Sequence, residues 1–348
     1  MTRTIDFHYF VVRNGATFCE LHAVAGAEPK IMMDDSDSIK MKLSGSFLPP
    51  EEDVNWLTDE IRPVMVIDGT EYSLGVFLPA NVAETENGGS QRVRVDAFDR
   101  DWIVKDYRME RMLFLQAGTK YLDAIGSVLA ESGITLISSV DSAEVLAEDR
   151  ADWEIGTPAL DIANQLLAEI NYEELWFEQQ GAAVLEPKAT PTANNIEHTL
   201  DETSVESLML PGIQRTTDFH SAPNVFICVC SNADKDSAMV AIAENTNPQS
   251  PLSLARRGRR IPVLVNVDNI ASQEELQLYA DRMVTDSMLK SEVIGVTTCL
   301  LPGYGVGDIV ALRYGETSAI CRAKRWTMDL KVGGHMDFTL ERVILNLE

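Results

Sequence analysis

The sequence predicts an α+β fold that is mainly β, with two similar small β-barrel modules and an α+β domain between them. Short alternating segments separated by Asn-Gly, Asp-Gly and Gly-Gly turns dominate both ends of the chain. A helical period begins near residue 118. A strand–turn–strand pattern near residue 64 recurs near residue 309. We therefore expect an N-terminal β-module, an α+β middle domain and a second β-module, at residues 1–111, 112–190 and 191–348.

Residues 1–110 are expected to contain strands only. Residues 7–12 and 17–25 read as a hairpin around Asn14-Gly15. Residues 38–44 alternate apolar and polar side chains, which is typical of a half-buried strand. A second hairpin is expected to turn at Asp68-Gly69. Strands at this spacing favour a small barrel or sandwich.

The middle domain is expected to combine helices with short strands. Thr119 can cap a helix that stops at Gly133. Thr157-Pro158 opens a second helix, because proline suits the first helical position. Short strands are expected at residues 134–137, 175–177 and 183–185.

The third module is expected to contain an inserted loop and the longest helix, at about residues 272–290. A capping-box pattern begins at Ser272, and the apolar residues that follow fit a single buried face. Strands are expected on both sides of this helix, at residues 205–210, 224–230, 239–243 and 292–301.

The two hairpins indicate an internal repeat. Residues 64–77 are followed by Gly88-Gly89 and an alternating strand, and residues 309–322 are followed by Gly333-Gly334 and another. Hairpins with glycine turns also recur by chance, so both origins stay open. A homotrimer of a duplicated chain would present six similar surfaces around one axis, and so could match a six-fold partner and a three-fold partner.

The formal net charge of −25 is the most unusual feature of the composition. Affinity for nucleic acid comes largely from Lys and Arg, so this charge argues against a nucleic-acid-binding protein. The simpler interpretation is solubility, but the charge is also compatible with a protein that lies near DNA without binding it. The chain has no apolar run of about 18 residues and no signal-peptide core, so we expect synthesis in a cytoplasm without membrane insertion.

The five cysteines are expected to be reduced and mostly buried. Cys228 and Cys230 are two apart in an expected strand, which places them at or beyond the reach of a disulfide. The others are Cys19, Cys299 and Cys321.

The order of these modules resembles the tail (baseplate) hub proteins of bacteriophages and prophages, a family also found in phage-derived contractile injection systems. The resemblance spans most of the chain and rests on patterns and weak motifs. The segments that carry it are Pro223-Asn224 before a strand, the helix at Thr157-Pro158, the helix at 272–290, Pro302 with Gly307-Asp308, and the hairpin from Arg325-Trp326 to Gly333-Gly334.

The resemblance implies a late structural protein at the tip of a virion tail. It implies a homotrimeric symmetry adapter between the six-fold tail tube, or a distal tail protein, and a three-fold spike. It also implies a central channel for the tape-measure protein and later for DNA, which would pass without specific binding. Some relatives carry a lytic domain, and none is expected here because the sequence ends at Glu348. Contractile and non-contractile tails, and phage, domesticated prophage and bacteriocin, all stay open.

No catalytic, cofactor or metal site is predicted. The glycines of the segment 303–307 resemble part of a dinucleotide fingerprint, but a strand-like segment follows where that fingerprint needs a helix. The histidines lack zinc spacing, and residues 34–37 lack the glycine and glutamate of a calcium loop. A structural turn is predicted instead, made by Pro302, Gly303, Gly305, Gly307 and Asp308.

One dense basic run stands out in the acidic chain: Arg256, Arg257, Arg259 and Arg260. It is either a solvated loop or a protein-contact loop that docks on an acidic surface of a neighbouring subunit or tail protein. We call these four residues the arginine loop.

Two other functions stay open beside a non-enzymatic hub. One is a tail-associated peptidase or cell-wall hydrolase with an unrecognised site, although no Ser, Cys or His constellation points to it. The other is a stand-alone β-rich receptor or glycan binder, for which 7% aromatic residues gives no excess.

Overall fold

Strands dominate the computed structural model, which describes residues 3–87, 90–189, 191–204, 208–217, 223–230, 239–267, 273–289 and 292–343. They account for 45% of the structure and helices for 15%, which confirms the α+β, mainly β class. Within the described residues, no helix is both long and apolar enough to span a membrane.

The chain folds into two compact units. Unit 1 comprises residues 1–190, 299–306 and 325–336, and unit 2 comprises residues 191–298, 307–324 and 337–348. The predicted boundary at 190 coincides with the end of the first segment of unit 1, but residues 299–306 and 325–336 of the predicted third module also belong to unit 1. The three-module division stays a prediction.

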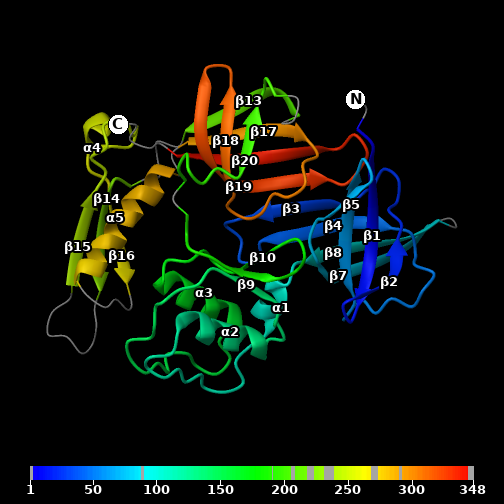
Figure 1. Cartoon of the computed structure of the whole chain (residues 1–348), viewed down its shortest axis with the longest axis horizontal. Helices are drawn as coiled ribbons and strands as arrows, with labels where there is room; N and C mark the ends of the chain where they lie inside the picture. Colours follow the sequence, from blue (N-terminus) through cyan, green and yellow to red (C-terminus); the bar gives the residue numbers. More distant parts are fainter. Residues whose placement is uncertain are drawn as a thin grey trace. The chain divides into compact units, whose positions relative to one another are not determined.

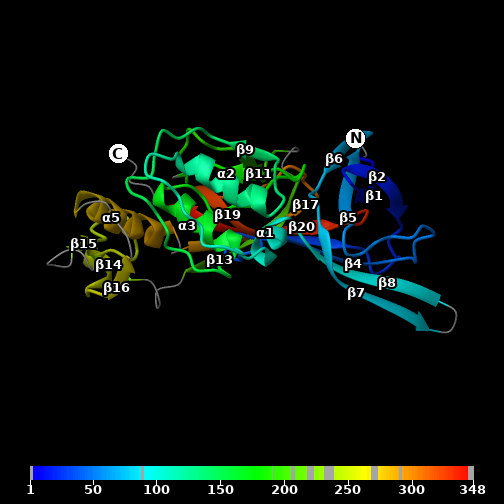
Figure 2. The same ribbon diagram turned by 90° about the horizontal axis from the view of Figure 1, so that it is seen from below.

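Unit 1 begins with eight strands (Figure 1), of which six are joined in a closed circuit of hydrogen bonds. They are β1 (Ile5–Arg13), β2 (Ala16–Leu21), β3 (Lys30–Asp34), β4 (Met41–Phe47), β5 (Glu60–Ile67), β6 (Thr70–Ser73), β7 (Leu78–Asn87) and β8 (Ser90–Phe98). β1 pairs with β2 and β5, and β8 pairs with β4 and β7 (Figure 2).

Two short bridges close this circuit. Ala23, just after β2, bridges to Phe47 of β4, and Ile61 of β5 bridges to Phe77, just before β7. Ile61 and Phe77 exchange two N–H···O bonds of 2.7 and 2.9 Å. The pairings therefore run from β1 through β2, β4, β8, β7 and β5 back to β1. Phe47 and Phe77 are fully buried and belong to the core of unit 1. The two barrel modules stay a prediction.

The rest of unit 1 is an α+β layer. Its helices α2 and α3 pack on each other through the apolar stripes that the sequence predicted, including Ile125, Leu129, Ile162 and Leu166. A small sheet of order β10-β11-β9 shares this core. The elements are α1 (Asp101–Asp106), α2 (Tyr121–Glu131), β9 (Ile137–Ser139), α3 (Ala159–Glu169), β10 (Trp176–Phe177) and β11 (Ala183–Leu185).

Unit 2 contains a sheet and a separate helix-covered layer. The sheet pairs β13 with β17, β17 with β20, β20 with β19, β19 with β18, and β18 with β12 in parallel. β19 continues into unit 1, where its residues from Arg325 pair with β3. The strands are β12 (His198–Asp201), β13 (Met209–Thr217), β17 (Glu292–Cys299), β18 (Ile309–Tyr314), β19 (Thr317–Asp329) and β20 (His335–Val343).

In the second layer of unit 2, helix α5 lies along a three-stranded sheet of order β15-β14-β16 (Figure 1). Phe226, Cys228 and Ala243 of the sheet pack against Leu276 and Ala280 of the helix. The elements are β14 (Val225–Cys230), β15 (Met239–Glu244), α4 (Leu254–Arg257), β16 (Pro262–Val267) and α5 (Gln273–Leu289).

Several predicted boundaries were wrong. The strand expected at 38–44 begins only at Met41, and the segment assigned to strands alone also contains the short helix α1. Lys120 precedes the first turn of α2, so Thr119 is not its cap. Pro158 has extended dihedral angles, and α3 begins one residue later. Ser272 of the expected capping box, residues 205–207 of an expected strand and Gly88-Gly89 lie outside the described residues.

The two copies of the internal repeat share their hairpin but differ in how the third strand pairs. The β5–β6 and β18–β19 hairpins both turn through a glycine with positive φ, Gly69 and Gly315. In the first copy β8 pairs with β4 and β7, whereas in the second β20 pairs with β19 of the hairpin itself. The correspondence in sequence therefore does not extend to the strand pairing.

Four of the five cysteines are buried, as the sequence predicted, and that the thiols are reduced stays a prediction.

Candidate interaction sites

Part of the arginine loop has regular secondary structure. Arg256 and Arg257 form the end of α4, whose first turn is capped when the Ser253 hydroxyl accepts a hydrogen bond from the Arg256 N–H. Gly258 ends the helix in the left-handed region at φ 65°. Arg259 and Arg260 then lead directly into β16, a strand that the sequence reading missed.

Asn224, the residue that precedes β14, holds this segment in place. The residue is fully buried. Its Nδ2 donates to the carbonyl oxygens of Arg259 (2.9 Å) and Leu252 (3.3 Å), and its Oδ1 accepts from the Ile261 N–H (2.7 Å). A single amide therefore satisfies three backbone groups around the arginine loop.

A second buried asparagine supports the other side of α4. The Asn245 Nδ2 donates to the Ser250 hydroxyl (2.9 Å), and the backbone carbonyl oxygen of Asn245 accepts from the Leu254 N–H (3.0 Å). Asn245 and Ser250 are both buried. Because buried polar groups with every partner in place rigidify a site, these contacts make α4 a fixed platform.

The guanidinium groups on this platform face solvent. Arg256, Arg259 and Arg260 are exposed. The Arg256 Nε donates to the Pro248 carbonyl (2.9 Å), and Arg260 forms an ion pair with Glu244 of β15 (2.5 Å) while remaining 57% exposed. The arrangement can bind carboxylates of another protein, and docking stays a proposal.

The turn from Pro302 to Asp308 connects two strands. β18 follows it directly, so no helix N-terminus is available for a phosphate. Gly303 has a φ of 90° and Gly307 a φ of 74°, a region that glycine enters without strain. The Gly305 carbonyl accepts from the indole N–H of buried Trp326 (3.3 Å).

The last two residues of the turn are held within unit 2. The Asp308 carboxylate lies 2.9 Å from the His198 Nε2, and its carbonyl accepts from the Ala323 N–H (2.8 Å). A Cβ placed on Gly307 would lie 2.7 Å from an Nη of Arg322, whose side chain is buried. Gly303, Gly305, Gly307 and Asp308 of this predicted turn thus each have a role in its conformation or its packing.

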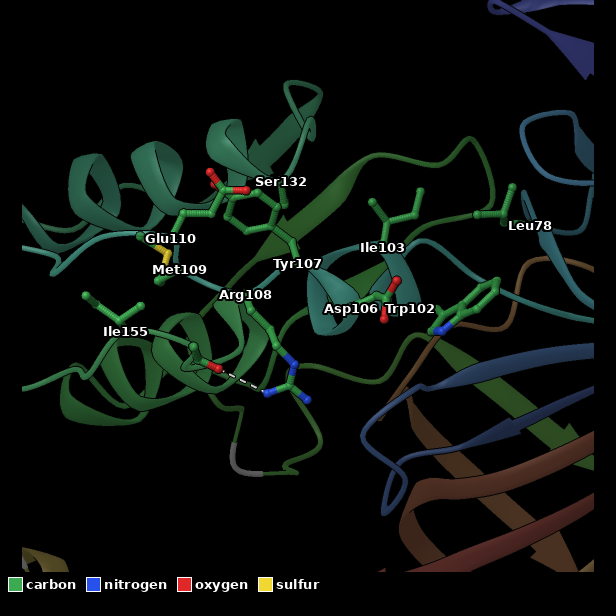
Figure 3. Close-up of a pocket in the computed structure, with 11 residues that line it drawn as sticks. Leu78, Trp102, Ile103, Asp106, Tyr107, Arg108, Met109, Glu110, Ser132 and Ile155 are labelled. Atoms are coloured by element: carbon green, nitrogen blue, oxygen red, sulfur yellow. Dashed lines mark hydrogen bonds between the residues drawn. The ribbon is translucent and has the colours of Figure 1, made fainter.

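Unit 1 contains a cavity of about 610 Å³ that the sequence reading did not find, because it had missed α1. Trp102, Ile103 and Met109 contribute apolar surface and Asp106 and Glu110 contribute carboxylates (Figure 3). The Arg108 guanidinium donates to the Gly156 carbonyl at 3.0 Å across one end. Within the described residues, no group of three or more His, Cys, Asp or Glu side chains could hold a metal.

Two buried carboxyl groups flank Arg100 at the start of α1. Asp99 accepts from the Met41 N–H (3.0 Å) and Asp101 from the Lys40 N–H (3.3 Å), and the other side-chain oxygen of each has no hydrogen-bond partner. Burial raises the pKa of Asp99 to about 7. Burial, followed by the neighbouring charge of Asp99, raises the pKa of Asp101 well above its ordinary value. The pair therefore favours protonation inside the fold.

Comparison with known proteins gives no match to a family model and no match among curated sequences. Solved structures do match. A tail protein from Neisseria meningitidis superposes with a TM-score of 0.67 at 16% identity, covering 96% of each chain. The 43 kDa tail protein of prophage MuSo2 from Shewanella oneidensis has a TM-score of 0.69 at 10% identity, covering 97% of this chain and 98% of its own.

A third match comes from a secretion system. It is a component of the E. coli type VI secretion system that is structurally similar to the T4 bacteriophage tail proteins gp27 and gp5. Its TM-score is 0.55 at 9% identity, with 97% of this chain and 77% of that chain covered. At sequence identities this low, the matches establish a shared fold only. This chain therefore has the fold of phage and prophage tail proteins, shared with a component of a phage-like secretion system.

Proposed function

We propose that the protein is a non-enzymatic structural hub of a phage or phage-like tail. The observation that carries the proposal is the extent of the structural likeness: two tail proteins match over at least 96% of this chain and of their own length. A match of that extent takes in both units, which favours a shared role over the borrowing of one module.

The hub is a homotrimer at the tail tip or baseplate, assembled in the bacterial host cytoplasm. It joins the six-fold tail tube, or a distal tail protein, to a three-fold spike, with a channel for the tape-measure protein and DNA. A net charge of −25 suits such a channel, because carboxylates repel phosphates and let DNA pass. The likeness to a type VI secretion component supports extending the same role to injection systems.

The mass of the full chain in solution tests this role. A trimer, or a ring that forms when the tube protein is added, supports the hub. A chain that stays monomeric at high concentration, with tube and spike proteins present, contradicts it.

A second measurement addresses the competing enzyme hypothesis. A hub acts by assembly and needs no catalytic group, so the purified chain should leave peptidoglycan and a generic protein substrate intact. Cleavage of either would point to the hydrolase that the sequence left open.

A further inference from the structure

The sheet β15-β14-β16 of unit 2 has two faces of different character. Its inner face packs on α5 (Figure 1) and buries Phe226, Cys228 and Ala243. The strand register places Ile227 between Ile242 and Leu264, and places Val229 beside Val240. Side chains alternate along a strand, so these five lie together on the opposite side. We call this the outer face: Ile227, Val229, Val240, Ile242 and Leu264.

The outer face is apolar and open to solvent. Val240, Ile242 and Leu264 are 48%, 50% and 62% exposed, and they lie on β15 and β16, the two strands that flank β14. Single exposed apolar residues are ordinary, but a contiguous group on a flat sheet is typical of an interaction surface. Burial of this group against another apolar surface is therefore favourable.

The edge of the sheet at β15 is protected. The Gln273 side chain donates to the Val240 carbonyl (2.9 Å), and the Gln277 side chain donates to the Ile242 carbonyl (3.2 Å). Since both acceptors already have donors from α5, addition of a foreign strand at this edge is disfavoured.

The arginine loop borders the outer face. Glu244 follows Ile242 by two residues on β15, and its side chain therefore points to the same side. Arg260 forms its ion pair with this carboxylate, which places the guanidinium at the border of the apolar group. The surface thus combines an apolar centre with a cationic rim, and each feature occurs in protein–protein interfaces.

We infer that the outer face and the arginine loop bind a second copy of this chain. The argument is one of charge complementarity. Each copy carries a net charge of −25, which opposes association. A stable contact between copies therefore needs a local surface of the opposite sign, and the arginine loop is the one dense basic run in the sequence. The inference rests on the homotrimer of the proposed function and names its contact surface.

In this contact the apolar side chains lose water at the centre, and the guanidinium groups pair with carboxylates of the neighbouring copy. Because Asn224 and Asn245 fix α4 in advance, little ordering of the loop is needed on association. The apolar centre supplies affinity, and the rim supplies the dependence on salt.

Sedimentation velocity of the full chain over a range of concentrations tests the contact. Ile242→Lys and Leu264→Lys place a charge at the centre of the outer face, and each is expected to weaken self-association at least tenfold. Leu278→Lys is the matched control, since Leu278 lies on α5 outside the outer face and is 52% exposed. Its self-association should equal that of the parent chain. Circular dichroism checks that all three variants fold.

The arginine loop has its own test. Replacement of Arg256, Arg259 and Arg260 by Ser is expected to weaken self-association at low salt and to reduce its dependence on salt. If the parent and the outer-face variants form equally stable trimers, the contact surface assigned here is wrong while the proposed hub stands. If the parent chain is monomeric at every concentration, also with tube and spike proteins present, both the contact and the homotrimer are wrong.

Discussion

The Arg100 guanidinium and the Glu60 carboxylate form a two-bonded ion pair, with N···O distances of 2.7 and 2.8 Å. The same guanidinium donates to the Gly181 carbonyl at 2.8 Å. Arg100 immediately precedes α1, Glu60 begins β5, and Gly181 lies between β10 and β11. One side chain therefore ties the strand circuit of unit 1 to its α+β layer.

Arg100→Lys is expected to loosen that connection. Lysine keeps the positive charge, but it cannot form both hydrogen bonds to the Glu60 carboxylate and the bond to the Gly181 carbonyl at the same time. Because the Arg100 and Glu60 side chains are only 23% and 15% exposed, we expect the substitution to lower the free energy of unfolding by about 1–2 kcal/mol. Urea denaturation monitored by tryptophan fluorescence measures it. The control is Arg111→Lys, whose pair with Glu131 has an arginine 74% exposed and should matter little. Equal losses in both variants would contradict the special role of Arg100.

The stability of unit 1 should fall as pH rises through neutrality. The pKa of Asp99 is raised to about 7 by burial, against about 3.9 for an unfolded aspartate. The fold thus favours the protonated form, and this contribution is fully present below about pH 4 and is lost as pH rises through 7. The pKa of Asp101 is raised as well, so the two protons belong to the pair.

Asp99→Asn checks this origin. Asparagine is neutral at every pH and can still accept from the Met41 N–H, so the melting temperature should fall less between pH 5 and 8. Asp161→Asn removes a carboxylate from the exposed side of α3 and should leave the pH profile of the parent. If the melting temperature of Asp99→Asn fell as steeply as that of the parent, the pH dependence would arise from groups other than Asp99.

Much of the fold follows from local patterns in the sequence. Asn14-Gly15 and Asp68-Gly69 turn their hairpins with positive φ, and the stripes of α2 and α3 are buried as their spacing predicted. Such elements can be predicted from the sequence because turn residues and hydrophobic periodicity act within a few positions of the chain.

The elements that could not be predicted from the sequence depend mostly on contacts with residues far away in the chain. β3 forms between β4 and a strand almost 300 residues away, with Asp34 opposite Arg325. α1 has six residues, too few for a periodic stripe. β16 follows a run of arginines that hides its alternation. The outer face could not be found from the sequence, because only the placement of α5 on one side of the sheet shows which residues stay exposed.

The arginine loop should lose its order when Asn224 is replaced by alanine. The variant leaves the Ile261 N–H and two carbonyl oxygens without their partner, at a cost of about 2–4 kcal/mol. Hydrogen exchange measured by mass spectrometry should accelerate in peptides that span residues 252–262. Gln249→Ala, at an exposed position of the preceding loop, is the control and should leave the exchange unchanged. Protection equal to that of the parent would mean that α4 is held by other contacts.

Alanine substitutions at Gly303 and Gly307, two glycines of the turn at 302–308, distinguish the cost of backbone strain from the cost of a steric clash. Both have positive φ, so alanine at either position costs about 1 kcal/mol in backbone strain. A Cβ on Gly303 meets nothing within 4 Å, whereas a Cβ on Gly307 would meet the buried Arg322 guanidinium at 2.7 Å. Gly307→Ala should therefore destabilise the fold more than Gly303→Ala, by about 1–2 kcal/mol.

Thermal and urea denaturation of the two alanine variants, measured side by side, give this difference directly. The double variant Gly307→Ala/Arg322→Ala reports on its cause. If the conflict with the guanidinium is responsible, alanine at 307 should cost less when Arg322 is already absent, and the coupling energy should approach the difference between the single variants. Additive losses would instead assign the whole effect to the backbone at φ 74°.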